Sequence, residues 1–212
     1  MKHLLPIVAL VALLVTGCAT TKHSDLSAFY AHPPRSIVVA PVLNNSPEIT
    51  APAIFTPSLG ISLAERGYYV FPMYFTATVF LDQGLSEAGH IHALPPRQFF
   101  DIFGADAVLF VTITEWSSKY VGIQGSVTVA AEYVLKDTRT GTVLWSGEQK
   151  IVKSEGGLSA EGAIKALMTA AIVPYKPLAI QANTQAFAPP LGIPAGPYLK
   201  DEHGKDQDKF KP

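Results

Sequence analysis

Two histidines, His90 and His92, have the spacing in this sequence that comes nearest to a metal site. If the segment is extended, both imidazoles point to the same side and could bind a transition metal ion. If it is helical, the two side chains diverge. No third ligand follows at a spacing typical of a metal site. We therefore expect both histidines to lie at the surface or at a helix end, and we predict neither a metal nor a cofactor.

Two carboxylates, Asp101 and Asp106, flank Gly104 and could act together as a general acid and a general base. Asp106, however, opens a predicted strand, and Asp101 falls on the polar side of a predicted helix, so we expect structural roles for both. The sequence also lacks a Gly-x-Ser-x-Gly nucleophile elbow, a phosphate-binding Gly-x-x-x-x-Gly-Lys and a zinc-binding His-Glu-x-x-His. These absences favour a protein that is not an enzyme.

The single cysteine, Cys18, follows a short basic start and an apolar run of about a dozen residues, which is too short to span a bilayer because a spanning helix needs about 20. The run is typical of a signal peptide, here residues 1–17. The residues Leu14-Val-Thr-Gly17 before the cysteine resemble the bacterial lipobox. That resemblance implies a diacylglyceryl group on the Cys18 sulfur, cleavage after Gly17 and a further acyl chain on the new amino terminus.

The residues after Cys18 bear on where the anchored protein goes. Position 19 is Ala and not Asp, a pattern that resembles lipoproteins sorted to the outer membrane. Residues 18–34 are mixed and polar and end in Pro33-Pro34, which predicts a lipidated tether that lets the domain stand off the membrane. The prediction is a protein anchored to the outer membrane and facing the periplasm.

A three-stranded antiparallel meander is expected to form the centre of the domain. Residues 104–116 are almost uniformly apolar, which predicts a strand buried on both faces. From Val127 to Leu135 apolar and polar residues alternate, as in a strand with one wet face. Asp137 to Gly141 has the composition of a tight turn, and it leads into a third strand that begins at Thr142.

The remaining elements are expected around this meander, within a single domain of residues 35–190. Residues 35–43 and 68–71 read as further strands. A helix begins either at Thr56-Pro57 or near Ala51-Pro52 with a kink at Pro57, and it ends before Gly67. Helical segments are also expected over residues 76–81, 87–94, 96–103, 164–175 and 178–187. Residues 191–212 are rich in Pro and Gly and then in charge, and we predict that they are disordered.

Three residues near the predicted strand ends are candidates for binding a partner: Glu115, Trp116 and Trp145. Aromatic side chains are favoured anchors of protein interfaces, although both tryptophans could equally pack into the core. A net charge of −1, with charged residues at 16% of the chain, offers no basic field for nucleic acid. The expected partners are therefore a membrane and other proteins.

Four segments together resemble one bacterial lipoprotein family, typified by a neisserial vaccine-candidate antigen. They are Asn44 to Glu48, Leu63 to Val70, Phe103 to Leu109 and Trp116 to Tyr120. The resemblance extends from Cys18 to about Phe187. The family's domain is similar to the periplasmic domain of the curli-secretion pore lipoprotein and, more loosely, to the amino-terminal domain of the Tol translocation protein.

The resemblance implies an α/β fold in which a single mixed sheet, with its antiparallel meander, is covered by helices on both faces. It also implies self-association, as a homodimer, and work beside other envelope lipoproteins in transport or secretion. No catalytic residue carries over. We therefore expect a non-enzymatic binding or assembly component. The alternatives are an activator lipoprotein of a cell-wall synthase, or a hydrolase that uses residues around Asp101 or His90.

Overall fold

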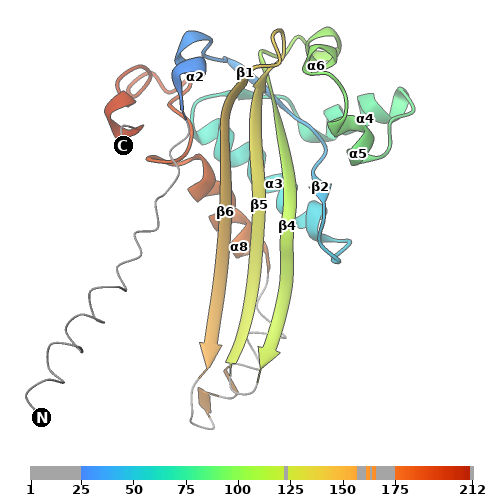
Figure 1. Cartoon of the computed structure of the whole chain (residues 1–212), viewed down its shortest axis with the longest axis vertical. Coiled ribbons are helices and arrows are strands. Elements are labelled where there is room, and N and C mark those ends of the chain that lie inside the picture. The colour runs from blue at the N-terminus through green and yellow to red at the C-terminus, as the bar shows by residue number, and fades with distance from the viewer. Residues whose placement is uncertain (1–24, 122–123, 157–160, 163, 166–174, 211–212) are drawn as a thin grey trace, which may run out of the picture.

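The computed structural model describes residues 25–121, 124–156, 161–162, 164–165 and 175–210 of the 212-residue chain (Figure 1). Cys18, the signal segment 1–17 and most of the predicted helix 164–175 lie outside these residues. The predictions made for them are therefore not addressed by the fold.

A mixed sheet of six strands runs through the molecule in the order β3-β1-β4-β5-β6, and β2 also pairs with β4. The strands β1, β2 and β3 are parallel to the strands they pair with, whereas β4, β5 and β6 form an antiparallel meander. The strand bounds are β1 Ser36–Val39, β2 Leu43–Asn44, β3 Tyr69–Val70, β4 Ala107–Val121, β5 Gln124–Asp137 and β6 Val143–Gly156.

Helices cover both faces of this sheet. Along β1, Ile37 and Val39 point to one side, and Val38 and Ala40 point to the other. The first side packs against α2, α3 and α8, and the second packs against α4, α5 and α6. Figure 1 shows α3 and α8 behind the meander and α2 near its upper end. The helix bounds are α2 Ser27–Ala31, α3 Ala51–Glu65, α4 Met73–Asp82, α5 Ala88–His92, α6 Pro96–Phe103 and α8 Tyr175–Phe187. The predicted fold class is confirmed.

The meander follows the predicted alternation on one face only. The odd-numbered side chains from Val127 to Leu135 are all buried. On the face that was predicted to be wet, Glu132 is exposed, but Thr128 and Ala130 are buried. In the turn, Asp137 Oδ1 accepts hydrogen bonds from the backbone amides of Arg139 at 2.9 Å and Thr140 at 2.7 Å. The strands extend several residues beyond the predicted ends. Figure 1 shows them continuing past the helices.

Helix α3 begins at Ala51, so the second of the two predicted starts is the observed one, and Pro57 lies inside the helix. The chain leaves α3 through Gly67, whose φ of 83° is the left-handed conformation expected of a glycine after a helix.

The carboxyl-terminal segment differs from its prediction, because residues 191–210 pack against the domain instead of being disordered. The Arg66 guanidinium donates to the carbonyl of Ile193 at 2.8 Å and to Asp206 Oδ2 at 3.0 Å. Asp206 is only 2% exposed and also accepts the amide of Ala195 at 2.8 Å. Phe210 completes the attachment by entering the main core. The prediction of disorder rested on the charged composition of this segment, which does not reveal that Asp206 forms a buried ion pair with Arg66.

The predicted tether also differs from what its described part shows. Leu26 and the Phe29 of α2 are both buried in the main core, so the folded domain begins before residue 35. Two apolar residues in a polar stretch are enough to attach a short helix, because burying each one removes apolar surface from water.

Candidate functional site

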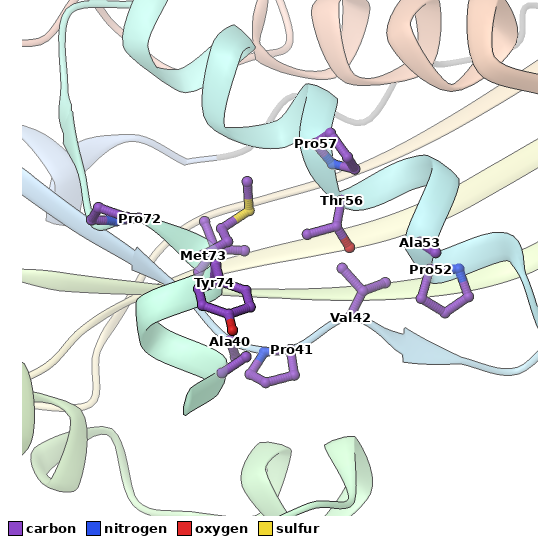
Figure 2. A pocket seen from close by; sticks show the side chains of 12 residues that line it. Ala40, Pro41, Val42, Pro52, Ala53, Thr56, Pro57, Pro72, Met73 and Tyr74 are labelled. Atoms are coloured by element: carbon purple, nitrogen blue, oxygen red, sulfur yellow. The ribbon is translucent and has the colours of Figure 1, made fainter. Parts of the chain in front are cut away.

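A cavity of about 640 Å³ lies between the end of β1, the first half of α3 and the start of α4 (Figure 2). Its volume falls in the range of small-molecule sites, roughly 300–1,000 Å³. The lining is formed by Val39, Ala40, Pro41, Val42, Pro52, Ala53, Thr56, Pro57, Pro72, Met73, Tyr74 and Ala77.

Four of the lining residues are prolines, and each has a structural reason to be there. Pro52 lies in the first turn of α3, and Pro72 immediately precedes α4, both positions that tolerate a residue without an amide proton. Pro57 lies inside α3 and cannot donate the usual helical hydrogen bond to the carbonyl of Ala53. Pro41 belongs to the connection between β1 and β2. The prolines therefore place rigid apolar rings on several sides of the cavity.

The two helices approach closely beside the cavity because α3 has a glycine there. A Cβ built on Gly60 would lie 3.0 Å from Cε of Met73, so a larger residue at position 60 would push Met73 away. Glycine in the interior of a helix is otherwise unfavourable by roughly 0.5–1 kcal/mol relative to alanine. The absence of a side chain at Gly60 therefore leaves room for Met73 in the lining.

The cavity is poor in polar groups. None of the lining side chains, all within the described residues, carries a charge at neutral pH. The side-chain hydroxyls belong to Thr56, which Figure 2 shows pointing toward Val42, and to Tyr74, which is 87% exposed. This lining can hold an apolar group, and it offers neither a carboxylate nor an imidazole for acid–base chemistry.

His92 lies next to the cavity wall, where its Nε2 is 2.9 Å from the carbonyl oxygen of Pro41. Burial lowers the pKa of His92, an effect that outweighs the hydrogen bond with Pro41, which acts in the opposite direction. His90 is exposed on the same short helix, α5, so the two imidazoles diverge as a helix requires. Across the ranges that the structure describes, no three His, Cys, Asp or Glu side chains converge on a possible metal position.

Asp101 and Asp106 do not form a catalytic pair. Asp101 is exposed on α6, where it pairs with Arg97 at 3.0 Å. Asp106 Oδ2 accepts the amides of Arg35 at 3.1 Å and Ser36 at 3.2 Å, and Oδ1 accepts Arg139 at 3.1 Å. Burial alone would raise the pKa of Asp106, but these hydrogen bonds prevail and lower it. Asp106 therefore fastens β1 to β4.

The predicted partner-binding rim of Glu115, Trp116 and Trp145 is not formed, because the tryptophans are buried at 2% and 1% exposure. Trp116 stacks on Tyr175 with 4.8 Å between ring centroids, and Trp145 Nε1 donates to the carbonyl of Leu191 at 2.9 Å. Both tryptophans belong to the main core, so the core-packing alternative describes them.

Glu115 is partly exposed and lies in a small charged cluster. Its carboxylate accepts Lys150 Nζ at 2.7 Å and Ser117 Oγ at 3.1 Å, and Lys119 Nζ lies 3.8 Å away. The hydrogen bond from Lys150 is the main reason that the pKa of Glu115 is lowered. Glu115 thus remains available at the surface without the aromatic neighbours that the prediction gave it.

The cavity is not visible in the sequence. In the sequence, Pro52 and Pro57 indicate only where a helix begins or kinks, and Pro41 falls within a predicted strand. The lining comes from three segments, residues 39–42, 52–57 and 72–77, that are far apart in sequence. Their meeting depends on the packing of α3 and α4, which local patterns do not specify.

Comparison with known proteins assigns the chain to a family. The family model described as "Putative lipoprotein GNA1162-like" matches residues 24–184, more than half of the chain. The chain belongs to this family. It is 36% identical over 162 residues to "Putative lipoprotein NMB1124/NMB1162" of Neisseria meningitidis serogroup B. The aligned residues cover 76% of this chain and 75% of the neisserial one. The resemblance predicted from four sequence segments is thereby confirmed.

A solved structure supports the fold at the same level of identity. The crystal structure of lipoprotein GNA1162 from Neisseria meningitidis is 36% identical to this chain and matches it with a TM-score of 0.54. The match covers 66% of this chain and 95% of the other. The protein is thus a member of a lipoprotein family with a mixed α/β fold. Within the described ranges, no helix combines the length and the apolar character that crossing a membrane requires.

Proposed function

We propose that this protein is held on the periplasmic side of the outer membrane by acyl chains on Cys18. The proposal rests on two observations that agree, the family of the chain and the sequence around its cysteine. The chain belongs to a family named as lipoproteins, and its only cysteine follows Leu14-Val-Thr-Gly17 at the end of a short apolar run. Two acyl chains hold a protein stably to a bilayer, because each buried methylene contributes ~0.8 kcal/mol.

At the membrane, the protein acts as a non-enzymatic binding or assembly component of a cell-envelope transport or secretion system, and it acts as a homodimer. Supporting this, the described surface carries an apolar cavity whose lining side chains include no acid–base group. Next to it, Tyr74 and Phe75 on α4 are 87% and 53% exposed. Exposed aromatic side chains beside a cavity are typical of surfaces that bind partners.

Anchoring is tested by following a clickable palmitate analogue and the membrane fraction in cells that produce the chain. The unsubstituted protein should be labelled and sediment with membranes, and Cys18→Ala should lose both the label and the sedimentation. Thr20→Ala, which leaves the cysteine in place, is the matched control and should behave as the unsubstituted chain. Membrane association of Cys18→Ala at the unsubstituted level would refute anchoring through this residue.

The assembly role is tested by crosslinking intact cells and identifying the proteins that co-purify with the chain. The proposal expects a crosslinked species of two copies, together with other envelope lipoproteins or components of a transport system. A chain recovered only as a monomer, under conditions that crosslink a known envelope dimer, would contradict both the homodimer and the assembly role.

A further inference from the structure

The cavity beside α3 and α4 has walls that are set before any ligand arrives. Proline rings have no side-chain rotamers to lose on binding, and four of the twelve lining residues are prolines. Filling such a cavity with an apolar group removes apolar surface from water at a small cost in ordering. The cavity therefore has the physical properties of a preformed binding site.

The scarcity of polar groups limits what the ligand can be. A peptide carries an amide and a carbonyl at each residue, and each of these groups needs a partner when it is buried. Among the lining side chains, the polar groups are the hydroxyls of Thr56 and Tyr74. These few groups cannot pair the backbone of a buried peptide. An alkyl chain has no polar groups to pair.

We infer that this cavity binds a single acyl chain. Since no lining residue within the described part of the molecule is charged, the site recognises the chain and not its head group. The head group would remain in solvent at the mouth, where Tyr74 is exposed. The acyl chain can come from a membrane lipid or from the anchor of a lipoprotein, which share this chemistry. The inference does not depend on the anchoring of Cys18.

The test measures binding of the fluorescent fatty acid cis-parinaric acid to the full chain carrying Cys18→Ala, so that no acyl chain is attached to the protein itself. We expect saturable binding of one probe per chain. Palmitate and its uncharged methyl ester should displace the probe equally well, because the lining has no charge to distinguish them. Displacement by palmitate but not by a triacylated cysteine peptide identifies membrane lipid as the source, whereas displacement by both identifies a site that also accepts the anchor of a lipoprotein.

Substitutions that fill the cavity locate the site. Ala53→Phe on α3 and Ala77→Phe on α4 each place a ring among the lining residues and should weaken probe binding by about tenfold or more. Ala64→Phe is the matched control, because Ala64 is exposed on α3 outside the lining, and it should bind as the parent chain does.

Two outcomes would overturn the inference. One is the absence of saturable binding to the parent chain, which needs no cavity variant to interpret. The other is a cavity variant that binds the probe as tightly as the parent and the control do. Such a variant counts only if it is folded, which is shown by unfolding at the parent's urea midpoint. The two cavity variants come from different helices, so one that fails to fold leaves the other to decide. Neither outcome would bear on labelling of Cys18 by palmitate.

Discussion

Asp106, which the sequence offered as a possible catalytic carboxylate, has surroundings that indicate a structural role. It accepts hydrogen bonds from the amides of Arg35 and Ser36 and from the Arg139 side chain, and so joins β1, β4 and the turn after β5. Asp106→Asn should lower the free energy of unfolding in urea by about 1–3 kcal/mol, because the amide loses charge-assisted hydrogen bonds and brings a donor toward two amides.

The matched control for this change is Asp101→Asn, since Asp101 is exposed and pairs with Arg97 one turn away on α6. Its free energy of unfolding should stay within about 0.5 kcal/mol of the unsubstituted chain. Equal stability of the Asp106→Asn and Asp101→Asn proteins would contradict the structural role assigned to Asp106.

His92 should make stability depend on pH. Burial lowers its pKa, so the unfolded chain binds the proton more readily than the folded chain. The free energy of unfolding should therefore decrease as pH falls through the ordinary histidine pKa of about 6.5. In urea titrations at several pH values, His92→Gln should reduce this slope while keeping a donor for the Pro41 carbonyl. His90→Gln, an exposed control, should retain it, and a slope unchanged in His92→Gln would refute the assignment.

At the scale of elements, a buried amide attaches α8 to the sheet and to α3. Asn183 is fully buried, accepts Tyr133 Oη at 2.8 Å and donates to Ser58 Oγ at 2.7 Å. Asn183→Ala should lower the free energy of unfolding by about 3 kcal/mol, because the hydroxyls of Tyr133 and Ser58 each lose a buried partner. The control Gln181→Ala, exposed on the same helix, should change it by less than about 0.5 kcal/mol. A cost for Asn183→Ala no larger than the control's would show that the network does not stabilise the fold.

The carboxyl-terminal segment is attached by the Arg66–Asp206 pair, with side chains 14% and 2% exposed. Asp206→Ala removes the buried carboxylate, which leaves Arg66 with the more exposed Glu202 at 4.0 Å and the Ala195 amide without its acceptor. A loss of about 3 kcal/mol is expected on urea unfolding. Limited proteolysis should also cut the segment after residue 190 faster. Asp201→Ala, at an exposed position in the same segment, is the control. Proteolysis at the parent rate in Asp206→Ala would indicate that the segment is held by its apolar contacts alone.

How far an element could be predicted depended on whether its pattern was local. The β5 alternation and the Asp137 turn are visible in the sequence because each depends on neighbouring residues. The start of α3 stayed open between two alternatives, since Pro57 is compatible with either a first turn or a kink. The attachment of residues 191–210 was missed because it depends on Arg66, more than a hundred residues away.

At the scale of the whole molecule, the fold class could be predicted from a family resemblance. Which residues are exposed, and where the surface is concave, could not. Trp116 and Trp145 could be predicted either as core or as rim, and only the position of α8 and residue Leu191 against the sheet decided for the core. The cavity likewise exists only once α3 and α4 have packed around the end of β1. Sites formed by segments distant in sequence need the assembled fold.

The assembled molecule is a helix-covered sheet with an apolar cavity, and it belongs to a family of lipoproteins. Confinement to a membrane would raise the rate at which such a domain meets other envelope proteins, which is the advantage that an anchor gives to an assembly component. The account of function therefore depends first on the chemistry of one sulfur atom.

Mass spectrometry of the amino-terminal peptide, from protein taken directly from cells, tests that chemistry most directly. We expect the peptide to begin at Cys18 and to carry a diacylglyceryl group on sulfur, with a further acyl chain on its amino group. Recovery of a peptide in which the Cys18 thiol is unmodified would contradict the account.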